Sequence, residues 1–225
     1  MRLLRVSVRR KQWNALFFEP DTPFEGEYAK DGGLLIDRTA FDESDLQEGC
    51  DCTEEQIEAL IRDSRRRRAY SKGMWLLSAR DYTEKGLTDK LRRDFGEDAA
   101  ARAVARLCEL GFVDDERYAY HYAERMMADG NLSARQARSK LMVKGVPREL
   151  AEAAVASVAV SDADQLDHWI ANKYAVKLAH GDPDQVRKVV NALMRRGFAY
   201  SEIRKALNRY AAELPDEEEE NDYAL

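Results

Sequence analysis

Three stretches of this sequence superimpose with a period of about fifty residues, and this repeat constrains the fold more than any other feature. Each stretch begins with Thr, Ser or Asp, which commonly cap a helix, and reaches a central leucine followed by basic residues. A glycine then ends the predicted helix, and a second amphipathic segment follows. The stretches start at Thr83, Ser133 and Asp182, their central leucines are Leu91, Leu141 and Leu193, and their glycines are Gly96, Gly145 and Gly197.

A further amphipathic segment precedes each stretch, over residues 66–79, 116–128 and 164–178. We therefore predict a mainly α fold of three tandem three-helix repeats, which form an elongated array because each unit buries its apolar face mainly against its neighbours. The predicted repeats span residues 65–115, 116–160 and 161–213.

Residues 1–64 have a different texture. Two short runs rich in β-branched and aromatic residues, LLRVSV and WNALFF, flank the polar segment RRKQ and predict a β-hairpin. Turn residues and another apolar run, LLI at 34–36, come next. Thr53 and Gln56 then form a capping-box pattern, with Ile57 and Leu60 following at helical spacing. We predict a small β-containing extension joined to the repeats by a helix.

Charge is unevenly distributed along the chain. The net charge of −6 combines about −7 over residues 1–64, +7 over residues 65–213, and −6 over residues 214–225, which we predict to be an acidic disordered tail. The net negative sum argues against a general polyanion-binding protein, whereas the basic middle allows a specific acidic partner.

We expect a cytoplasmic protein without a membrane span. The longest uncharged apolar candidate, residues 153–161, is about half the length that a span requires. The N-terminal residues lack the apolar run of a signal peptide. Three cysteines make no disulfide framework and fit a reducing compartment.

The segment from Leu110 to Ala119, LGFVDDERYA, reads as a structural joint between the first two repeats. We expect Gly111 to adopt a left-handed conformation and Phe112, with Val113, to plug the gap between helices. Asp114 would cap the next helix, and Asp115 would lie in its first turn, where negative charge is favourable. Tyr118 belongs to the apolar side of that helix.

An alternative interpretation makes Asp114 and Asp115 a metal-binding or acid–base pair in an enzyme that also uses the cysteines. Adjacent residues at a helix start do not converge on one point, as catalytic carboxylates must. Cys50 and Cys52 are more tightly spaced than structural zinc pairs, and no second pair stands nearby. The sequence also lacks GxxxxGK, GxGxxG and nucleophile-elbow patterns. We predict no catalysis, no metal and no cofactor.

Basic residues recur on the repeated helices and predict a basic stripe that contacts an acidic or phosphate-bearing partner. An ordinary solvated helix face is the alternative for any single member. The candidate contact residues are Arg65, Arg66, Arg67, Arg68, Lys85, Lys90, Arg92, Arg93, Arg117, Arg135, Arg138, Lys140, Lys144, Arg187, Lys188, Arg195, Arg196, Arg204 and Lys205.

Several short sequence motifs resemble those of the RecX regulatory proteins in their residues, order and spacing. They are LLSAR at 76–80, KLxxxxG at 90–96, LGFVDDERYA at 110–119, LMVKGV at 141–146 and RRGF at 195–198. The resemblance covers about residues 65–213, and LQEG at 46–49 is similar to a turn in the extension of some members. One departure is Gly86, which stands where the family usually has the Glu of a capping box.

This resemblance implies three tandem three-helix repeats and a non-catalytic function. It implies binding to the RecA recombinase filament on single-stranded DNA, within the filament's groove, and modulation of RecA, most often inhibition. DNA contact would be weak or made through the filament, and we expect a monomer. The alternative from a different class is a stand-alone DNA-binding protein that uses its repeats as helix-turn-helix modules.

Overall fold

The structure is a computed structural model that describes residues 1–9, 12–19, 29–30, 33–128, 132–179 and 181–213. The predicted acidic tail, residues 214–225, lies outside the described residues. The chain divides into two compact units, Met1–Asp114 and Asp115–Leu225, and each is described by itself.

The first unit begins with a small antiparallel sheet of four strands in the order β1-β2-β4-β3. The strands are β1 (Arg2–Arg9), β2 (Trp13–Glu19), β3 (Ala29–Lys30) and β4 (Gly33–Asp37). β1 and β2 pair antiparallel, which confirms the predicted hairpin, and LLI forms β4. The buried side chains of Leu3, Leu16 and Ile36 pack with α2 residues Ile57 and Leu60 in one core, so the sheet is covered by helix.

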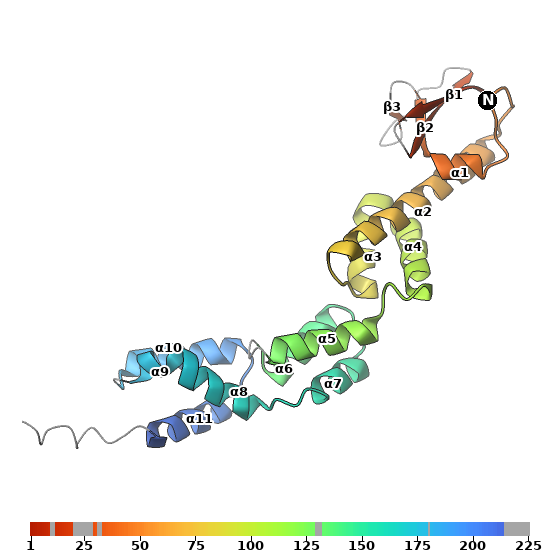
Figure 1. Cartoon of the computed structure of the whole chain (residues 1–225). Coiled ribbons are helices and arrows are strands. Elements are labelled where there is room, and N and C mark those ends of the chain that lie inside the picture. The colour runs from red at the N-terminus through yellow and green to blue at the C-terminus, as the bar shows by residue number, and fades with distance from the viewer. Residues whose placement is uncertain (10–11, 20–28, 31–32, 129–131, 180, 214–225) are drawn as a thin grey trace, which may run out of the picture. The chain divides into compact units, whose positions relative to one another are not determined.

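Helix α1 (Arg38–Asp42) is short, and α2 (Glu54–Ala79) has 26 residues. Thr53 and Gln56 make the predicted capping box: the Gln56 N–H donates to Thr53 Oγ1 at 3.2 Å, and the Thr53 N–H donates to Gln56 Oε1 at 2.9 Å. α2 runs without a break past residue 64, where we placed a boundary. Ser64 is fully buried, and its Oγ accepts a hydrogen bond from the Asp37 N–H at 2.8 Å. One helix therefore serves both the sheet and the first three-helix unit (Figure 1).

α3 (Glu84–Phe95) and α4 (Glu97–Glu109) complete the first three-helix unit. Leu91, the first central leucine, is fully buried among side chains of all three helices. Gly73 allows α2 and α4 to approach closely, because a Cβ at this position would lie 2.7 Å from Leu107 Cδ1. Thr83 caps α3 even with Gly86 at the third position, since the Gly86 N–H donates to Thr83 Oγ1 at 3.0 Å.

The second unit begins with three helices: α5 (Asp115–Ala128), α6 (Ala134–Val143) and α7 (Arg148–Ala156). Leu141 is fully buried with Ala119, Ala123 and Ala151, and small alanines on α5 and α7 leave room for it. Gly145 has a φ of 96° after α6, as its predicted role in ending that helix requires.

The last three-helix group contains a π-helical turn that the sequence did not indicate. The predicted helix over 164–178 is α8 (Asp162–Trp169), the π turn η1 (Ile170–Tyr174) and α9 (Ala175–Leu178). The Trp169 and Tyr174 rings stack across this turn with centroids 5.9 Å apart. α10 (Pro183–Arg195) and α11 (Tyr200–Glu213) follow, and Leu193 is fully buried in their shared core.

A direct contact joins these last two groups of helices. The Ser133 N–H donates to the Arg196 carbonyl at 3.1 Å, and Asp162 Oδ1 accepts from the Ala134 N–H at 2.9 Å. Gly197, with a φ of 95°, lies against the start of α6.

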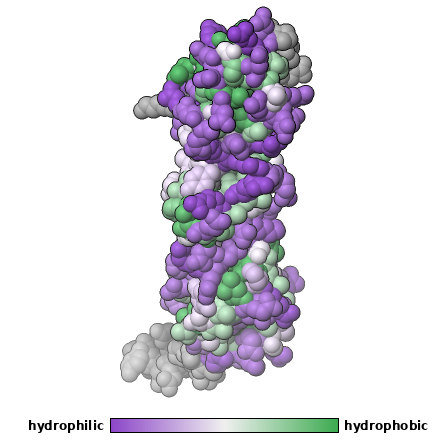
Figure 2. Space-filling view, turned by 90° about the vertical axis from the view of Figure 1, so that its right-hand side faces the viewer, coloured by the Kyte–Doolittle hydropathy of each residue, from purple (hydrophilic) through white to green (hydrophobic). Residues whose placement is uncertain are grey.

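Hydrophilic side chains cover most of the face that Figure 2 draws. On the face drawn in Figure 2, hydrophobic side chains form only small separate groups. Within the described residues, none of the helices combines the length and the apolar character that crossing a membrane requires.

Candidate partner-binding surface

The joint after α4 follows the prediction in part. Gly111 has a φ of 73°, and the N–H groups of Phe112 and Val113 both donate to the Leu107 carbonyl, at 2.9 and 3.3 Å. Val113 is buried in the core of the first three-helix unit. Phe112 is 45% exposed and lies outside this core, so its predicted place in the gap toward the next repeat stays a prediction.

Asp114 directly precedes α5, and Asp115 is its first residue. Tyr118, one turn further along, stacks on Tyr122 with ring centroids 6.0 Å apart. Lys144 Nζ lies 5.7 and 5.6 Å from these two ring centroids. Burial raises the pKa of Tyr122. The distances place the Lys144 ammonium within cation–π range of both rings.

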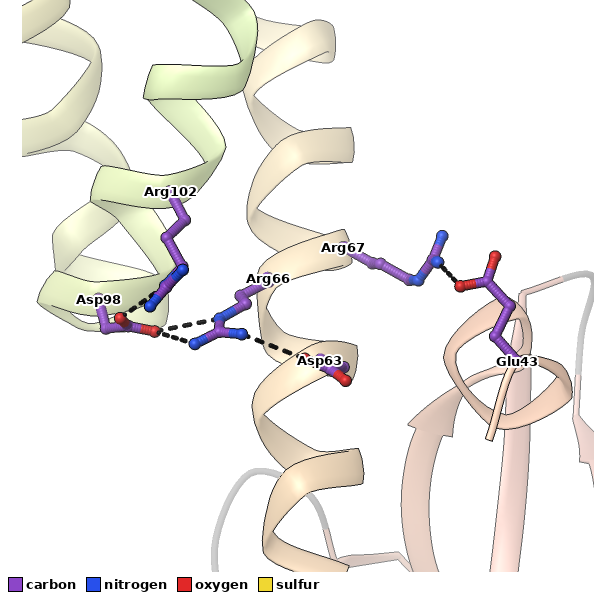
Figure 3. Close-up of polar contacts among 6 residues, drawn as sticks. All are labelled: Glu43, Asp63, Arg66, Arg67, Asp98 and Arg102. Carbon is purple, nitrogen blue, oxygen red and sulfur yellow. Dashed lines mark hydrogen bonds and ion pairs between the residues drawn. The ribbon is translucent and has the colours of Figure 1, made fainter. Parts of the chain in front are cut away.

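Arg65 to Arg68, the densest basic run, is half-buried instead of forming an open patch. Arg66 contacts Asp98 at 3.0 Å and Asp63 at 3.3 Å, and Arg67 pairs with Glu43 (Figure 3). The Arg68 guanidinium lies over the rings of Trp13 and Phe95, at 4.8 and 5.4 Å. These arginines therefore connect α2 to the sheet, to α1 and to the other helices of the first unit.

Asp98, at the start of α4, is shared between two arginines. Its oxygens accept from Arg102 Nε at 2.9 Å and from Arg66 Nε and Nη2 at 3.1 and 3.0 Å. Hydrogen bonds from Arg102 and Arg66 lower the pKa of Asp98. Its carboxylate thus remains ionised and holds α2 and α4 together through charge-assisted hydrogen bonds.

The predicted cations of α3 divide into two kinds. Lys85 and Arg92 both pair with Asp89, at 3.2 and 3.1 Å, and Arg92 also reaches Glu97 at 3.5 Å. Lys90 and Arg93 are exposed and make no ion pair with any described residue. Only the second kind keeps its charge fully available at the surface.

The cations of α6 are more engaged than expected. Arg138 pairs with Glu152 at 3.5 Å, and Arg135 Nε donates to the Gly197 carbonyl at 3.3 Å. Lys140, directly before the buried Leu141, is exposed and has no ion pair among the described residues. Arg117 is exposed on α5.

The predicted cations of α10, α11 and the turn between them also divide into those with a partner and those that are exposed without an ion pair among the described residues. Arg187 pairs with Asp184 at 3.5 Å, Lys205 with Glu202 at 3.0 Å, and Arg196 lies 4.2 Å from the Trp169 ring centroid. The remaining three predicted cations are exposed without an ion pair to the described part of the chain, and they are Lys188, Arg195 and Arg204.

When the three-helix units are aligned on their central leucines, exposed cations without an ion pair among the described residues recur at two positions of the alignment. Lys90 and Lys140 directly precede Leu91 and Leu141, whereas Arg93 and Arg195 lie two residues after Leu91 and Leu193. A residue next to a buried leucine on a helix faces away from the core, which explains their exposure. We define the open cations as Lys90, Arg93, Lys140, Lys188, Arg195 and Arg204.

Sequence reasoning missed Arg102 and Arg106 on α4. Their spacing of four residues places them on one helix face. This spacing could be read from the sequence. That the two arginines face Arg38 of α1 and the arginines of α2, Arg66 and Arg67, is visible only in the folded unit.

The cysteines offer no metal centre in the described residues. Cys50 Sγ and Cys52 Sγ lie 3.5 Å apart, and no group of three or more His, Cys, Asp or Glu within the described ranges could hold a metal ion. Burial, with the Cys50 hydrogen bond, raises the pKa of Cys52 to about 11.

Comparison with known families bears on the repeated helices. Family models for the first, second and third three-helix domains of RecX match residues 69–107, 114–155 and 161–207. The matches follow one another in order and together cover more than half of the chain. The chain belongs to the RecX family. The resemblance in sequence motifs is thus confirmed, as is the fold class of three three-helix domains after a small N-terminal sheet.

Individual RecX proteins match over most of the chain. A regulatory protein RecX of Caldanaerobacter subterraneus is 30% identical over 190 residues, which cover 84% of this chain and 91% of the relative. The regulatory protein RecX of Trichlorobacter lovleyi is 31% identical, over 62% of this chain and 94% of its own length.

Two crystal structures share the fold. A regulatory protein RecX structure aligns with a TM-score of 0.62 at 20% identity and covers 91% of this chain and 98% of its own. The RecX structure from Lactobacillus salivarius gives a TM-score of 0.55 at 24% identity, over 67% of this chain and 99% of its own. The alignment over 91% of the chain extends the likeness beyond the three domain matches.

Proposed function

We propose that this protein is a non-catalytic regulator that binds the RecA filament on single-stranded DNA and inhibits its recombinase, ATPase and strand-exchange activities. The observation that carries the proposal is the ordered match of all three RecX domains. A partner that assembles on chromosomal DNA places the activity in the cytoplasm, and we propose that the protein acts as a monomer.

The open cations supply a physical basis for binding to such a filament. They occur in each of the three three-helix units, and each exposed cation alone contributes little to affinity. A filament presents the same surfaces at intervals, so several weak contacts made by one chain add through effective concentration. Repeated contacts on one molecule therefore suit a polymeric partner better than a single compact one.

The direct test is titration of the protein into RecA with single-stranded DNA. We expect the DNA-dependent ATPase rate and the yield of strand exchange to fall as the protein is added. Unchanged rates at several-fold molar excess over RecA would reject the proposal. Tight, salt-sensitive binding to naked DNA without any effect on RecA would instead support a stand-alone DNA-binding protein.

A pair of charge reversals tests the open cations. We expect Lys90→Glu combined with Lys140→Glu to raise the concentration needed for half-inhibition about tenfold, because two charge contacts are lost at equivalent positions of two units. The matched control is Arg62→Glu with Lys177→Glu, which changes net charge equally at exposed positions of α2 and α9. Equal loss of inhibition in both double variants would show that net charge, not position, matters.

A further inference from the structure

A cavity of about 480 Å³ lies in the first unit, where α1, α2 and α4 meet. Five arginines line it: Arg38 of α1, Arg66 and Arg67 of α2, and Arg102 and Arg106 of α4. Asp37 is the acidic residue of the lining, and its Oδ1 already accepts the Ala40 N–H at 3.1 Å. The cavity falls within the size range of small-ligand sites, and its lining is strongly cationic.

Carboxylates outside the lining hold most of these arginines in place. Asp98 binds both Arg66 and Arg102, and Glu43 pairs with Arg67 (Figure 3). Glu109 contacts Arg106 at 2.8 Å. The lowered pKa of Asp98 means that its charge persists through the neutral range. Such support pre-organises the guanidinium groups, so less side-chain entropy is lost when a ligand binds.

Donor capacity remains after these contacts are made. A guanidinium has five N–H donors. Arg67, Arg102 and Arg106 each use a single nitrogen in their contacts with the described residues, and the Arg38 guanidinium uses none. The cavity therefore presents several N–H groups that point to no acceptor in the described parts of the chain.

We propose that this cavity binds two neighbouring phosphate groups. Phosphate oxygens accept the forked pairs of N–H donors that arginine offers, and these charge-assisted bonds are stronger than neutral ones. Because carboxylates already balance part of the arginine charge, one singly charged anion gains little, whereas two phosphates engage several guanidiniums together. Tyr70 and Ser71 add hydroxyl groups to the same lining. The phosphates can belong to a free polyphosphate or nucleotide, or to successive units of a nucleic-acid backbone.

The test measures binding to the full-length protein without RecA, so its result is independent of the proposed function. The probes are tripolyphosphate and ATP, followed by calorimetry, and a fluorescent oligothymidine, followed by anisotropy, all at one ionic strength. Binding of tripolyphosphate or ATP identifies a free polyphosphate site, whereas binding of the oligonucleotide alone identifies the backbone as the source. Absence of binding by all three probes overturns the proposal.

The decisive variant is Arg38→Gln with Arg106→Gln, which removes two lining guanidiniums and leaves the Arg66–Asp98–Arg102 group intact. We expect affinity for the bound probe to fall about tenfold or more. The control is Arg148→Gln with Arg187→Gln, which removes equal charge from arginines paired with Glu152 and Asp184 in the other unit. An equal fall in both overturns the proposal.

Arg38→Lys with Arg106→Lys keeps the charge and removes the planar fork, so an intermediate affinity is expected. Matching thermal melts of the three double variants would show that lost binding is not lost folding. A lysine variant that binds as tightly as the unaltered protein would contradict recognition by the forked donors.

Discussion

Gly197 shows at the residue scale why a repeated glycine has more than one role. Gly96, Gly145 and Gly197 occupy equivalent places in the repeat, and all three have positive φ values. At Gly197, however, a Cβ would also come within 2.5 Å of Ser133 Oγ and 2.6 Å of Gln136 Cβ. This position therefore needs glycine both for its backbone and for the contact between α6 and the turn before α11.

Replacement of Gly197 by alanine should lower the free energy of unfolding by about 2 to 4 kcal/mol, from backbone strain and the overlap with Ser133 and Gln136. The measurement is chemical denaturation. Gly181→Ala is the control, since its φ of 60° is also left-handed but no atom lies within 4 Å of a Cβ there. It should cost only about 1 to 2 kcal/mol. Equal losses would contradict the close contact at Gly197.

The central leucines are the second residue-scale determinant. Leu141→Ala or Leu193→Ala should cost about 2 to 5 kcal/mol of unfolding free energy, because both side chains are fully buried and would leave cavities. Denaturation of each variant provides the measurement. Val143→Ala, at a position 76% exposed on α6, is the comparison and should change stability little. A similar loss at Val143 would refute the burial argument.

At the element scale, α2 links two cores that the sequence suggested were separate. Its first half packs on the sheet, and its second half packs on α3 and α4. Arginines of the basic run in its middle form ion pairs with Glu43 and Asp98 and cation–π contacts with the rings of Trp13 and Phe95. The sequence made these four arginines candidate contacts of a partner, with an ordinary solvated helix edge as the alternative. Consecutive residues point in different directions around a helix, so single members of the run meet different neighbours.

The shared contact of Asp98 with α2 gives a pH-dependent prediction. A carboxyl with a lowered folded-state pKa stabilises the fold above its unfolded pKa, and that stabilisation disappears as pH falls through the folded value. Asp98→Asn should therefore lower stability at neutral pH, by an amount that shrinks in acid and in high salt. Denaturation curves over a pH series supply the measurement.

Glu109→Gln is the control for this experiment, because among the described residues the ion pair of Glu109 is with Arg106 of its own helix, at 2.8 Å. Its effect should be smaller at neutral pH. A loss in Asp98→Asn that stays constant from neutral pH to strong acid would contradict the ionic origin of the contact.

At the scale of the whole molecule, the net charge of −6 is the sum of an acidic first segment, a basic middle segment and an acidic last segment. The basic middle is further reduced by internal pairing, since many of its arginines bind carboxylates of the same unit. Among the predicted contact residues, the open cations and the unused donors of the arginine-lined cavity thus keep charge available to a partner. This smaller positive surface suits specific contacts better than general binding to polyanions.

Removal of residues 214–225 should raise affinity for naked DNA, because these residues carry six acids and no base. The measurement is a salt titration of oligonucleotide binding by the full-length and shortened proteins. The matched variant keeps the full length and replaces the six acids by Asn or Gln, so that it separates the effect of charge from the effect of chain length. The six acids are Asp216, Glu217, Glu218, Glu219, Glu220 and Asp222. Superimposable titrations would reject an electrostatic role for these residues.

The sequence by itself determined the capping box and the buried leucines, because these depend on spacings of two to four residues along one helix. It also determined the repeats, because one pattern recurs about every fifty residues, and the hairpin, because two β-type runs flank a short polar segment. Only the tertiary structure decided which cations remain open. Arg67 meets Glu43 across 24 positions, Arg66 meets Asp98 across 32, and Arg135 meets Gly197 across 62. Partners so distant in the chain leave no periodic signal, since they are brought together by the packing of whole helices rather than by the geometry of any one of them.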